Sequence, residues 1–397
     1  MLITFALIRV IFSFNPCNLF PNPCQSFPKS VSILPIYFIG QCLSLDEHPS
    51  FRETIIVQFS DPGYDWNSFI WTCSNHLVLP VIYLKFLKYD LLGYLPEVLA
   101  QHLEEIYSLN RTRNEQIILQ VKEMNATLNA AGISPIYLKG TGNLIDGVYS
   151  DPGERIIGDI DFLVPESDFL ATAECFKNEG YQICFPAYLP YDQMKHYPRL
   201  WKEDVAADLE IHRVPVTQKY ADHFSSEIVQ QSKKTVTDFP GCYVLSDNDK
   251  VTLNFIHSQL SNSGHRLGTV SLRDIYDLYC FSKRVDLQQL AQVTPYLKKY
   301  KTYCDIAYKL LRLPIIDKQT LASKVFCRKH DLNLSSPLFS ILNRLPWTIS
   351  MFIFFVIPMK WKEFFHYQEA RQILVRKMGS KTWYIQQLEI YKKMITG

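Results

Sequence analysis

The stretch of residues 138–164, LKGTGNLIDGVYSDPGERIIGDIDFLV, constrains the fold of this chain more than any other part of the sequence. An apolar run over 133–138, bounded by glycines, leads into it and predicts a buried strand. We expect a helix from Thr141, a turn at 150–153 and a second strand over 156–164. A strand, a glycine turn, a helix and another strand in this order indicate an α/β core.

The second predicted strand carries two carboxylates. Asp159 and Asp161 are two residues apart, so they share one face of a strand and can converge on one divalent cation or bridge two. Gly140 and its small neighbours at the helix start leave backbone N–H groups open to a phosphate. The Asp247-x-Asp249 pair precedes a helix without a strand, so we interpret it as helix capping. The first pair, in its ordered setting, predicts a metal and phosphate site.

Further elements follow the carboxylate strand. A helix is expected over 167–178, ending at Gly180, with a strand over 181–185. The segment 205–214 alternates between apolar and polar residues, which predicts another strand. Its apolar face has Ala207, Leu209 and Ile211, and its polar face has Asp208, Glu210 and His212.

Helical spacing dominates both flanks of this core. Apolar residues recur with a helical period around Pro80, between Pro96 and Gly132, and again after Asp249. The stretch from Pro96 to Gly132 predicts one long helix or two in line. We therefore expect an α+β protein with a small mixed sheet between helical regions. The predicted divisions are an unassigned apolar and proline-rich extension at 1–40, a helical region at 41–132, the α/β core at 133–245 and a helical region at 246–397.

Charge and cysteine content narrow the class of protein. The 397 residues include 41 Lys and Arg against 39 Asp and Glu, a net charge of +2. This balance gives no broad basic field for a nucleic-acid backbone. The ten cysteines form no Cys-x-x-Cys pair, which argues against a zinc ribbon or a redox pair. We expect buried thiols, a reducing compartment and a cytoplasmic location.

Two apolar runs, over 1–14 and 349–359, are too short to span a membrane as a helix, so we expect no transmembrane span. The first also lacks the basic flank of a signal peptide. For the second we expect a buried helix or strand, and contact with a membrane surface is the alternative.

The core motifs resemble the uncharacterised bacterial nucleotidyltransferases of the DNA polymerase β-like superfamily. That family has a Leu-Lys-Gly turn, an Arg shortly before Asp-x-Asp, a helix ending before Gly-Tyr, and later an acidic residue two before a His. A further His and an Arg-Asp pair follow in its helical region. The matching residues, within about 65–300, are Leu138-Lys139-Gly140, Arg155, Asp159, Asp161, Gly180-Tyr181, Glu210 with His212, His257 and Arg273-Asp274.

The resemblance implies a polymerase β-like nucleotidyltransferase core and a metal-dependent reaction. A nucleoside monophosphate would pass from a triphosphate such as ATP to an acceptor hydroxyl on a small molecule, a sugar or a protein. Asp159, Asp161 and Glu210 would hold two Mg²⁺ or Mn²⁺ ions, which neutralise charge on the attacking and leaving oxygens. Asp208 competes with Glu210 as the third carboxylate, and the acid-x-His pattern favours Glu210.

Cationic and small residues complete the expected site. Lys139 and Arg155 are the expected phosphate partners; a solvated strand end and a surface ion pair with Glu154 or Asp151 are their respective alternatives. Gly140 and Thr141 form the phosphate turn, and His212 completes the substrate-binding set, more as a structural residue than as a metal ligand. His196 and His257 are weaker candidates, and the histidines show no zinc-like spacing.

The phosphate turn departs from the superfamily pattern. Many members have Gly-Ser or Gly-Gly-Ser there, whereas this chain has Lys-Gly-Thr, with Thr141 as the available hydroxyl. A second hypothesis is therefore a catalytically silent nucleotide-binding or scaffold protein on the same fold. A third, a nucleic-acid end modifier, is disfavoured by the near-neutral charge.

Overall fold

The computed structural model describes residues 35–366, except 185–190, 238, 294 and 314–318, together with parts of 368–385. Most of the predicted extension at 1–40 therefore lies outside the described residues. Helices make up the first described part of the chain. They are α2 (Pro35–Leu43), α3 (Phe51–Phe59), α4 (Trp66–Asn75), α5 (Leu79–Lys88), the 3-10 helix η2 (Leu92–Tyr94) and α6 (Glu97–Ala130).

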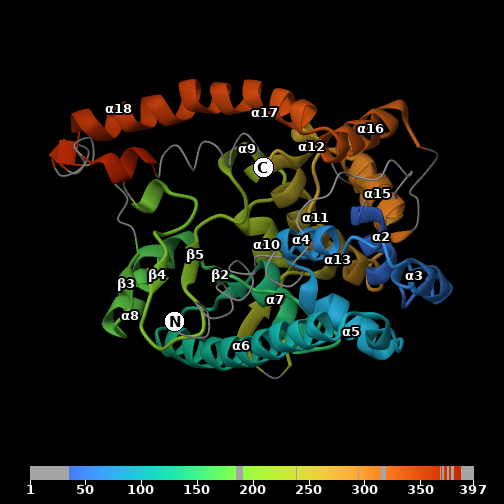
Figure 1. Cartoon of the computed structure of the whole chain (residues 1–397). Coiled ribbons are helices and arrows are strands. Elements are labelled where there is room, and N and C mark those ends of the chain that lie inside the picture. The colour runs from blue at the N-terminus through green and yellow to red at the C-terminus, as the bar shows by residue number, and fades with distance from the viewer. Residues whose placement is uncertain are drawn as a thin grey trace.

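Seven short strands in the described part form one mixed sheet. They are β1 (Ile136–Tyr137), β2 (Ile160–Leu163), β3 (Gln182–Ile183), β4 (Leu200–Trp201), β5 (Leu209–His212), β6 (Lys234–Val236) and β7 (Phe239–Val244). Their order across the sheet is β3-β4-β5-β2-β1-β7-β6. Figure 1 labels β3, β4, β5 and β2 next to one another. The central strands β2 and β5 are parallel, and β1 is antiparallel to β2 but parallel to β7. The expected α+β architecture with a mixed sheet is confirmed.

The remaining helices connect the strands and follow them. Between strands lie α7 (Lys139–Ile145), η3 (Pro152–Glu154), η4 (Glu166–Asp168), α8 (Phe169–Asn178), η5 (Tyr191–Gln193), α9 (Gln218–Ala221) and α10 (Ser226–Ser232). After the sheet come α11 (Asp247–Phe255), the π-helix η6 (Ile256–Ser261), α12 (Gly264–Leu267), α13 (Leu272–Ser282), α14 (Leu287–Val293) and α15 (Leu297–Leu311). The last are α16 (Leu321–Ser335), α17 (Pro337–Met351), the π-helix η7 (Phe352–Val356) and α18 (Ile357–His366).

The long helix α6 joins two hydrophobic clusters. Its 34 residues extend about 50 Å, and it lies along one side of the molecule in Figure 1. Leu99 and Ile106 in its first half pack with the other N-terminal and the C-terminal helices. Val121 and Leu128 in its second half pack with the sheet and α8. The apolar stripe predicted between Pro96 and Gly132 therefore packs against the helical part of the molecule at one end and against the sheet at the other.

Buried polar side chains of α6 hold the backbone that leads into β2. Asn114 Nδ2 donates to the carbonyls of Pro152 (2.6 Å) and Arg155 (2.7 Å). Arg113 donates to the carbonyls of Ile157 and Gly158. Side chains therefore satisfy these carbonyls in place of a neighbouring strand, so β2 begins at Ile160 and not at residue 156 as predicted.

Near the C-terminus, the apolar run 349–359 is helical, but it is not buried as expected. It continues α17 through η7 into α18, which pass along the edge of the molecule opposite α6 (Figure 1). Ile353 and Phe354 in this run are 50% and 69% exposed. In the part of the chain that is described, no single helix is long and apolar enough to cross a membrane. The bent pair α4 and α5 passes that length and composition test only when taken together.

Candidate active site

Two adjacent parallel strands bring the predicted carboxylates together. In the register of β2 and β5, Asp161 pairs with Glu210 and Leu163 pairs with His212. Asp161, Glu210 and His212 therefore share one face of the sheet, because directly paired residues and residues two apart on a strand point the same way. The period-2 pattern of 205–214 predicted this face correctly, although the ordered strand is only Leu209–His212.

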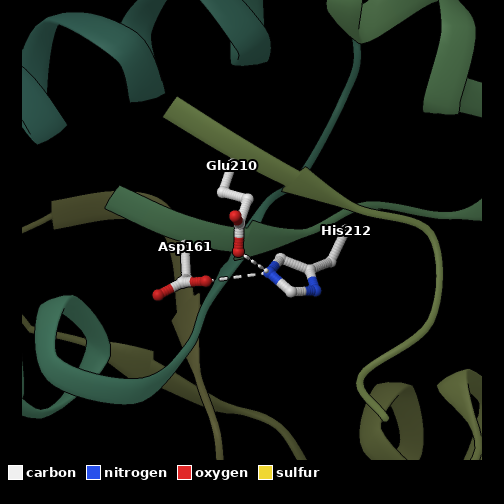
Figure 2. A group of neighbouring side chains, drawn as sticks. All are labelled: Asp161, Glu210 and His212. Carbon is white, nitrogen blue, oxygen red and sulfur yellow. Dashed lines mark hydrogen bonds and ion pairs between the residues drawn. The ribbon is translucent and has the colours of Figure 1, made fainter. Parts of the chain in front are cut away.

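The three side chains form a compact group. One ligand atom from each lies within 4.8 Å of the others. His212 Nε2 lies 2.8 Å from Asp161 Oδ1 and 3.2 Å from Glu210 Oε2, as the dashed lines in Figure 2 show. His212 is fully buried, Asp161 is nearly so, and Glu210 is partly open. Two carboxylates and an imidazole thus meet at the inner end of a site that Glu210 connects to solvent.

Lys139 supplies a positive charge to this group. It is the first residue of α7, and its Nζ lies 2.5 Å from Asp161 Oδ1 and 3.7 Å from Glu210 Oε2. Its φ of +48° is in the left-handed region that a non-glycine residue adopts at a cost of about 1 kcal/mol. A lysine at a position that suits glycine indicates that its side chain serves a purpose here.

The charges in this group shift the pKa values of its members. Burial alone would raise the pKa of Asp161, but Lys139 and the hydrogen bond from His212 outweigh it and hold that pKa well below its usual range. For Glu210, burial also acts upward, and the hydrogen bond from His212 leaves the pKa lowered. Burial would lower the pKa of Lys139, but attraction to Asp161 leaves it raised. Both carboxylates are therefore ionised at neutral pH.

The surroundings of His212 favour one tautomer. Its Nδ1 is buried and has no hydrogen-bond partner among the described residues, whereas Nε2 faces both carboxylates. A proton on Nε2 therefore satisfies two acceptors, while a proton on Nδ1 would be buried without one. His212 in this tautomer donates to Asp161 and orients it. Its Nε2 could equally offer a lone pair to a metal ion held by the two carboxylates, so the expectation that His212 supports the site more than it binds a metal stays a prediction.

Asp159 lies apart from the compact group and has a different partner. Arg199 Nη2 is 2.5 Å from Asp159 Oδ2 and 3.5 Å from Glu210 Oε1, so this guanidinium bridges the two carboxylates. Burial, together with repulsion from Asp161, raises the pKa of Asp159 to about 6. Asp208 immediately precedes the paired residue Leu209 and does not belong to the compact group. The geometry therefore favours Glu210 over Asp208 as the carboxylate next to Asp161.

Arg155 is committed to another buried charge. Its Nη2 donates to Asp277 Oδ2 (2.8 Å) and its Nε to Asp277 Oδ1 (3.0 Å), and Tyr149 also donates to Asp277 Oδ1 (2.8 Å). Asp277 is on α13, far along the chain. The structure thus shows a buried pair with Asp277, and not the surface pair with Glu154 or Asp151 that was the alternative for this residue. Its guanidinium still lines the pocket beside Lys139.

The phosphate turn is packed inside the fold. Thr141 is fully buried and its Oγ1 donates to the carbonyl of Asp159 (3.1 Å). A Cβ on Gly142 would lie 2.4 Å from the carbonyl oxygen of Tyr137, so only glycine lets α7 approach β1 this closely. Gly140 lies beside Ile157 and Arg155. The Thr141 hydroxyl expected at the phosphate is therefore occupied within the protein, and α7 begins at Lys139, two residues earlier than predicted.

Sequence reasoning missed Arg199, which lies in the segment that precedes β4, and treated His196 in the same segment as a weaker candidate. Tyr197 N donates to Ile211 O (2.8 Å) and Arg213 N to Lys195 O (2.9 Å), so this segment runs antiparallel beside β5. It thereby brings Arg199 to the carboxylates and places His196 Nδ1 4.0 Å from Glu210 Oε1. A loop residue that reaches a site only through such pairing leaves no spacing signal in the sequence.

Comparison with known proteins identifies the family. No curated protein matches the chain. A family model described as an uncharacterised nucleotidyltransferase matches residues 62–310, which is more than half of the chain and includes both carboxylate strands and α13. The chain is therefore a member of this nucleotidyltransferase family.

Proposed function

We propose that the protein is a metal-dependent enzyme that moves a nucleoside monophosphate from a nucleoside triphosphate to an acceptor hydroxyl. The observation that carries this proposal is the register of β2 and β5, which pairs Asp161 with Glu210 beside His212. Family membership supports the reaction class. The strand, helix and carboxylate-strand order around α7 supports a polymerase β-like core as the underlying fold. The free, mostly buried thiols fit the expected cytoplasmic location.

The donor atoms suit a hard divalent cation. Asp161 and Glu210 offer ionised carboxylate oxygens, the ligands that Mg²⁺ and Mn²⁺ prefer. Asp159 lies outside their compact group and is paired with Arg199. The buried His212 orients Asp161 and Glu210 through its Nε2. We propose that these three carboxylates hold the metal ions, two in number, with Asp208 outside the set. When bound, the metal ions would neutralise the charge that develops on the phosphate oxygens.

The residues of the chain have distinct roles in the proposed reaction. The acceptor oxygen forms a bond to the α-phosphorus, and the bond from that phosphorus to the bridging oxygen breaks to release pyrophosphate. Glu210, which is more exposed than Asp161, accepts a hydrogen bond from the acceptor hydroxyl and takes its proton. Lys139 carries positive charge to the same place, 2.5 Å from Asp161.

Calorimetric titration of the full chain with each of the four ribonucleoside triphosphates, with Mg²⁺ present or chelated, tests this proposal. We expect metal-dependent binding of one triphosphate, lost in Asp161→Asn and Glu210→Gln and kept in the matched control Asp208→Asn. Thermal melting would show that each variant is folded. Equal loss in Asp208→Asn would reverse the assignment of the third carboxylate.

One observation favours the alternative of a catalytically silent nucleotide-binding or scaffold protein. The Thr141 hydroxyl, expected at the phosphate turn, donates to Asp159 O inside the protein. Triphosphate binding that is the same with and without metal, and unchanged in Asp161→Asn, would favour this alternative over the transferase.

A further inference from the structure

A pocket adjoins the carboxylate cluster on the side away from β5. Residues of α7, α11, η6 and α13 line it, and Lys139 belongs to both the pocket and the cluster. Arg155, Lys250 and Arg273 add three further cations to its lining, against the two carboxylates Asp274 and Asp277. The lining therefore carries an excess of positive charge next to the proposed metal site.

Most of these cations already have a close carboxylate. Arg155 is bound by Asp277 at 2.8 Å, Lys139 lies 2.5 Å from Asp161, and Lys250 contacts Asp146. These ion pairs hold the walls of the pocket in place. The paired carboxylates also neutralise most of the charge that these three cations could offer to a ligand.

Arg273 is held differently. The nearest carboxylate oxygen to its Nε is Asp274 Oδ1 at 3.6 Å, beyond hydrogen-bond distance, and this Nε is buried without a hydrogen-bond partner among the described residues. Repulsion from Arg155, followed by burial, lowers the pKa of Arg273. Arg155 therefore adds positive charge near Arg273. An anion bound beside Arg273 would offset this charge and accept a hydrogen bond from the buried Nε–H.

We propose that this pocket binds the terminal phosphates of the nucleoside triphosphate and that Arg273 is the residue that recognises them. The inference rests on the proposed transferase function, because it places the terminal phosphates of the donor nucleoside triphosphate in the pocket next to Lys139. Polyphosphate oxygens match the planar fork of an arginine, which binds them through paired hydrogen bonds. Arg155, the phosphate partner expected from the sequence, acts here as the fixed neighbour that Asp277 holds in place.

Inorganic tripolyphosphate is the direct probe of this pocket. It should be titrated into the full chain in chelator, so that the metal-binding carboxylates take no part. We expect binding to the wild type, about tenfold or more weaker binding to Arg273→Gln, and an intermediate affinity for Arg273→Lys, which keeps the charge without the fork. Arg328→Gln, an equal charge change at an exposed position of α16, should bind as the wild type does.

The outcomes separate this inference from the proposed function. Unchanged binding in Arg273→Gln, or no binding of tripolyphosphate to the folded wild type, would overturn the pocket assignment even if metal-dependent nucleotide binding is found. Tripolyphosphate binding could depend on Arg273 while nucleoside triphosphate binding is unchanged by Asp161→Asn. That result would support the pocket assignment and contradict the proposed transferase function. Arg273→Lys preserves the buried charge, so it guards against a loss of folding in Arg273→Gln.

Discussion

Two buried groups of charges meet at Lys139, and they differ in how their carboxylates are used. On the pocket side, Arg155 and Tyr149 fill the oxygens of Asp277. On the sheet side, Asp161 and Glu210 converge from paired positions on β2 and β5, and one histidine and one lysine lie between them. The first group is a closed ion pair that stabilises the fold. The second concentrates negative charge that a cation could share, which is what the proposed metal site requires.

Breaking the closed pair should have the largest effect on stability. Asp277→Asn leaves the Arg155 guanidinium buried without a countercharge, and we expect a loss of about 3–5 kcal/mol in the free energy of unfolding. Urea denaturation measures this loss. Asp274→Asn, on the same helix α13, is the matched control; burial raises the pKa of Asp274, so losing its charge should cost much less. Equal losses in the two variants would remove the distinction between a closed pair and its neighbour.

Acid should weaken the pocket side through His257. Burial, and then repulsion from Lys139, lowers the pKa of His257 to about 4, so protonation favours the unfolded chain. The stability that neutral His257 contributes is complete above pH about 6.5 and is lost as the pH falls toward 4, by up to about 3 kcal/mol. We expect His257→Gln to have a flatter stability profile over this range. A profile like that of the wild type, which is expected for the exposed His223→Gln, would contradict this role.

The hydrogen bonds through which Asn114 of α6 holds the segment before β2 can be tested separately. Asn114→Ala removes two hydrogen bonds and leaves the carbonyls of Pro152 and Arg155 buried without that donor. We expect a loss of about 2 kcal/mol in the free energy of unfolding. The adjacent Glu115 forms a surface ion pair with Arg111, and Glu115→Ala should cost less than about 0.5 kcal/mol. If both variants unfold at the same urea concentration, the hydrogen bonds of Asn114 contribute nothing to the free energy of unfolding.

The smallest effect concerns the backbone at Lys139. Lys139→Gly and Lys139→Ala lose the same ion pairs, but glycine accommodates the φ of +48° without steric cost. The glycine variant should therefore be about 1 kcal/mol more stable than the alanine variant. Thermal melting of the two proteins side by side would show it, and a more stable alanine variant would mean that the left-handed conformation is not kept.

The sequence was informative wherever the chemistry follows strand periodicity. Alternation placed Glu210 and His212 on one face, as the register of β2 and β5 has them. Spacing by two residues did not bring Asp159 into the compact group, because β2 begins at Ile160 and Asp159 pairs with Arg199. The predicted bounds of the carboxylate strand were too long, because side chains of α6 satisfy the carbonyls of Arg155 and Gly158 that a neighbouring strand would otherwise pair.

Contacts between distant segments could not be predicted. Arg155 and Asp277 are 122 residues apart, and nothing local in the sequence links them. Arg199 reaches Asp159 through a segment whose pairing with β5 has no periodic signal. The exposure of Phe354 also depends on tertiary packing, since an apolar run has the same pattern whether or not other helices cover it.

Manganese binding tests the central claim most directly, that Asp161 and Glu210 form a metal centre. Electron paramagnetic resonance can count free Mn²⁺ during titration of the wild type, Asp161→Asn and Asp208→Asn. We predict binding by the wild type and by Asp208→Asn, and at least about tenfold weaker binding by Asp161→Asn, which loses a charged ligand. Wild-type affinity in a folded Asp161→Asn variant would contradict the account and place any metal elsewhere.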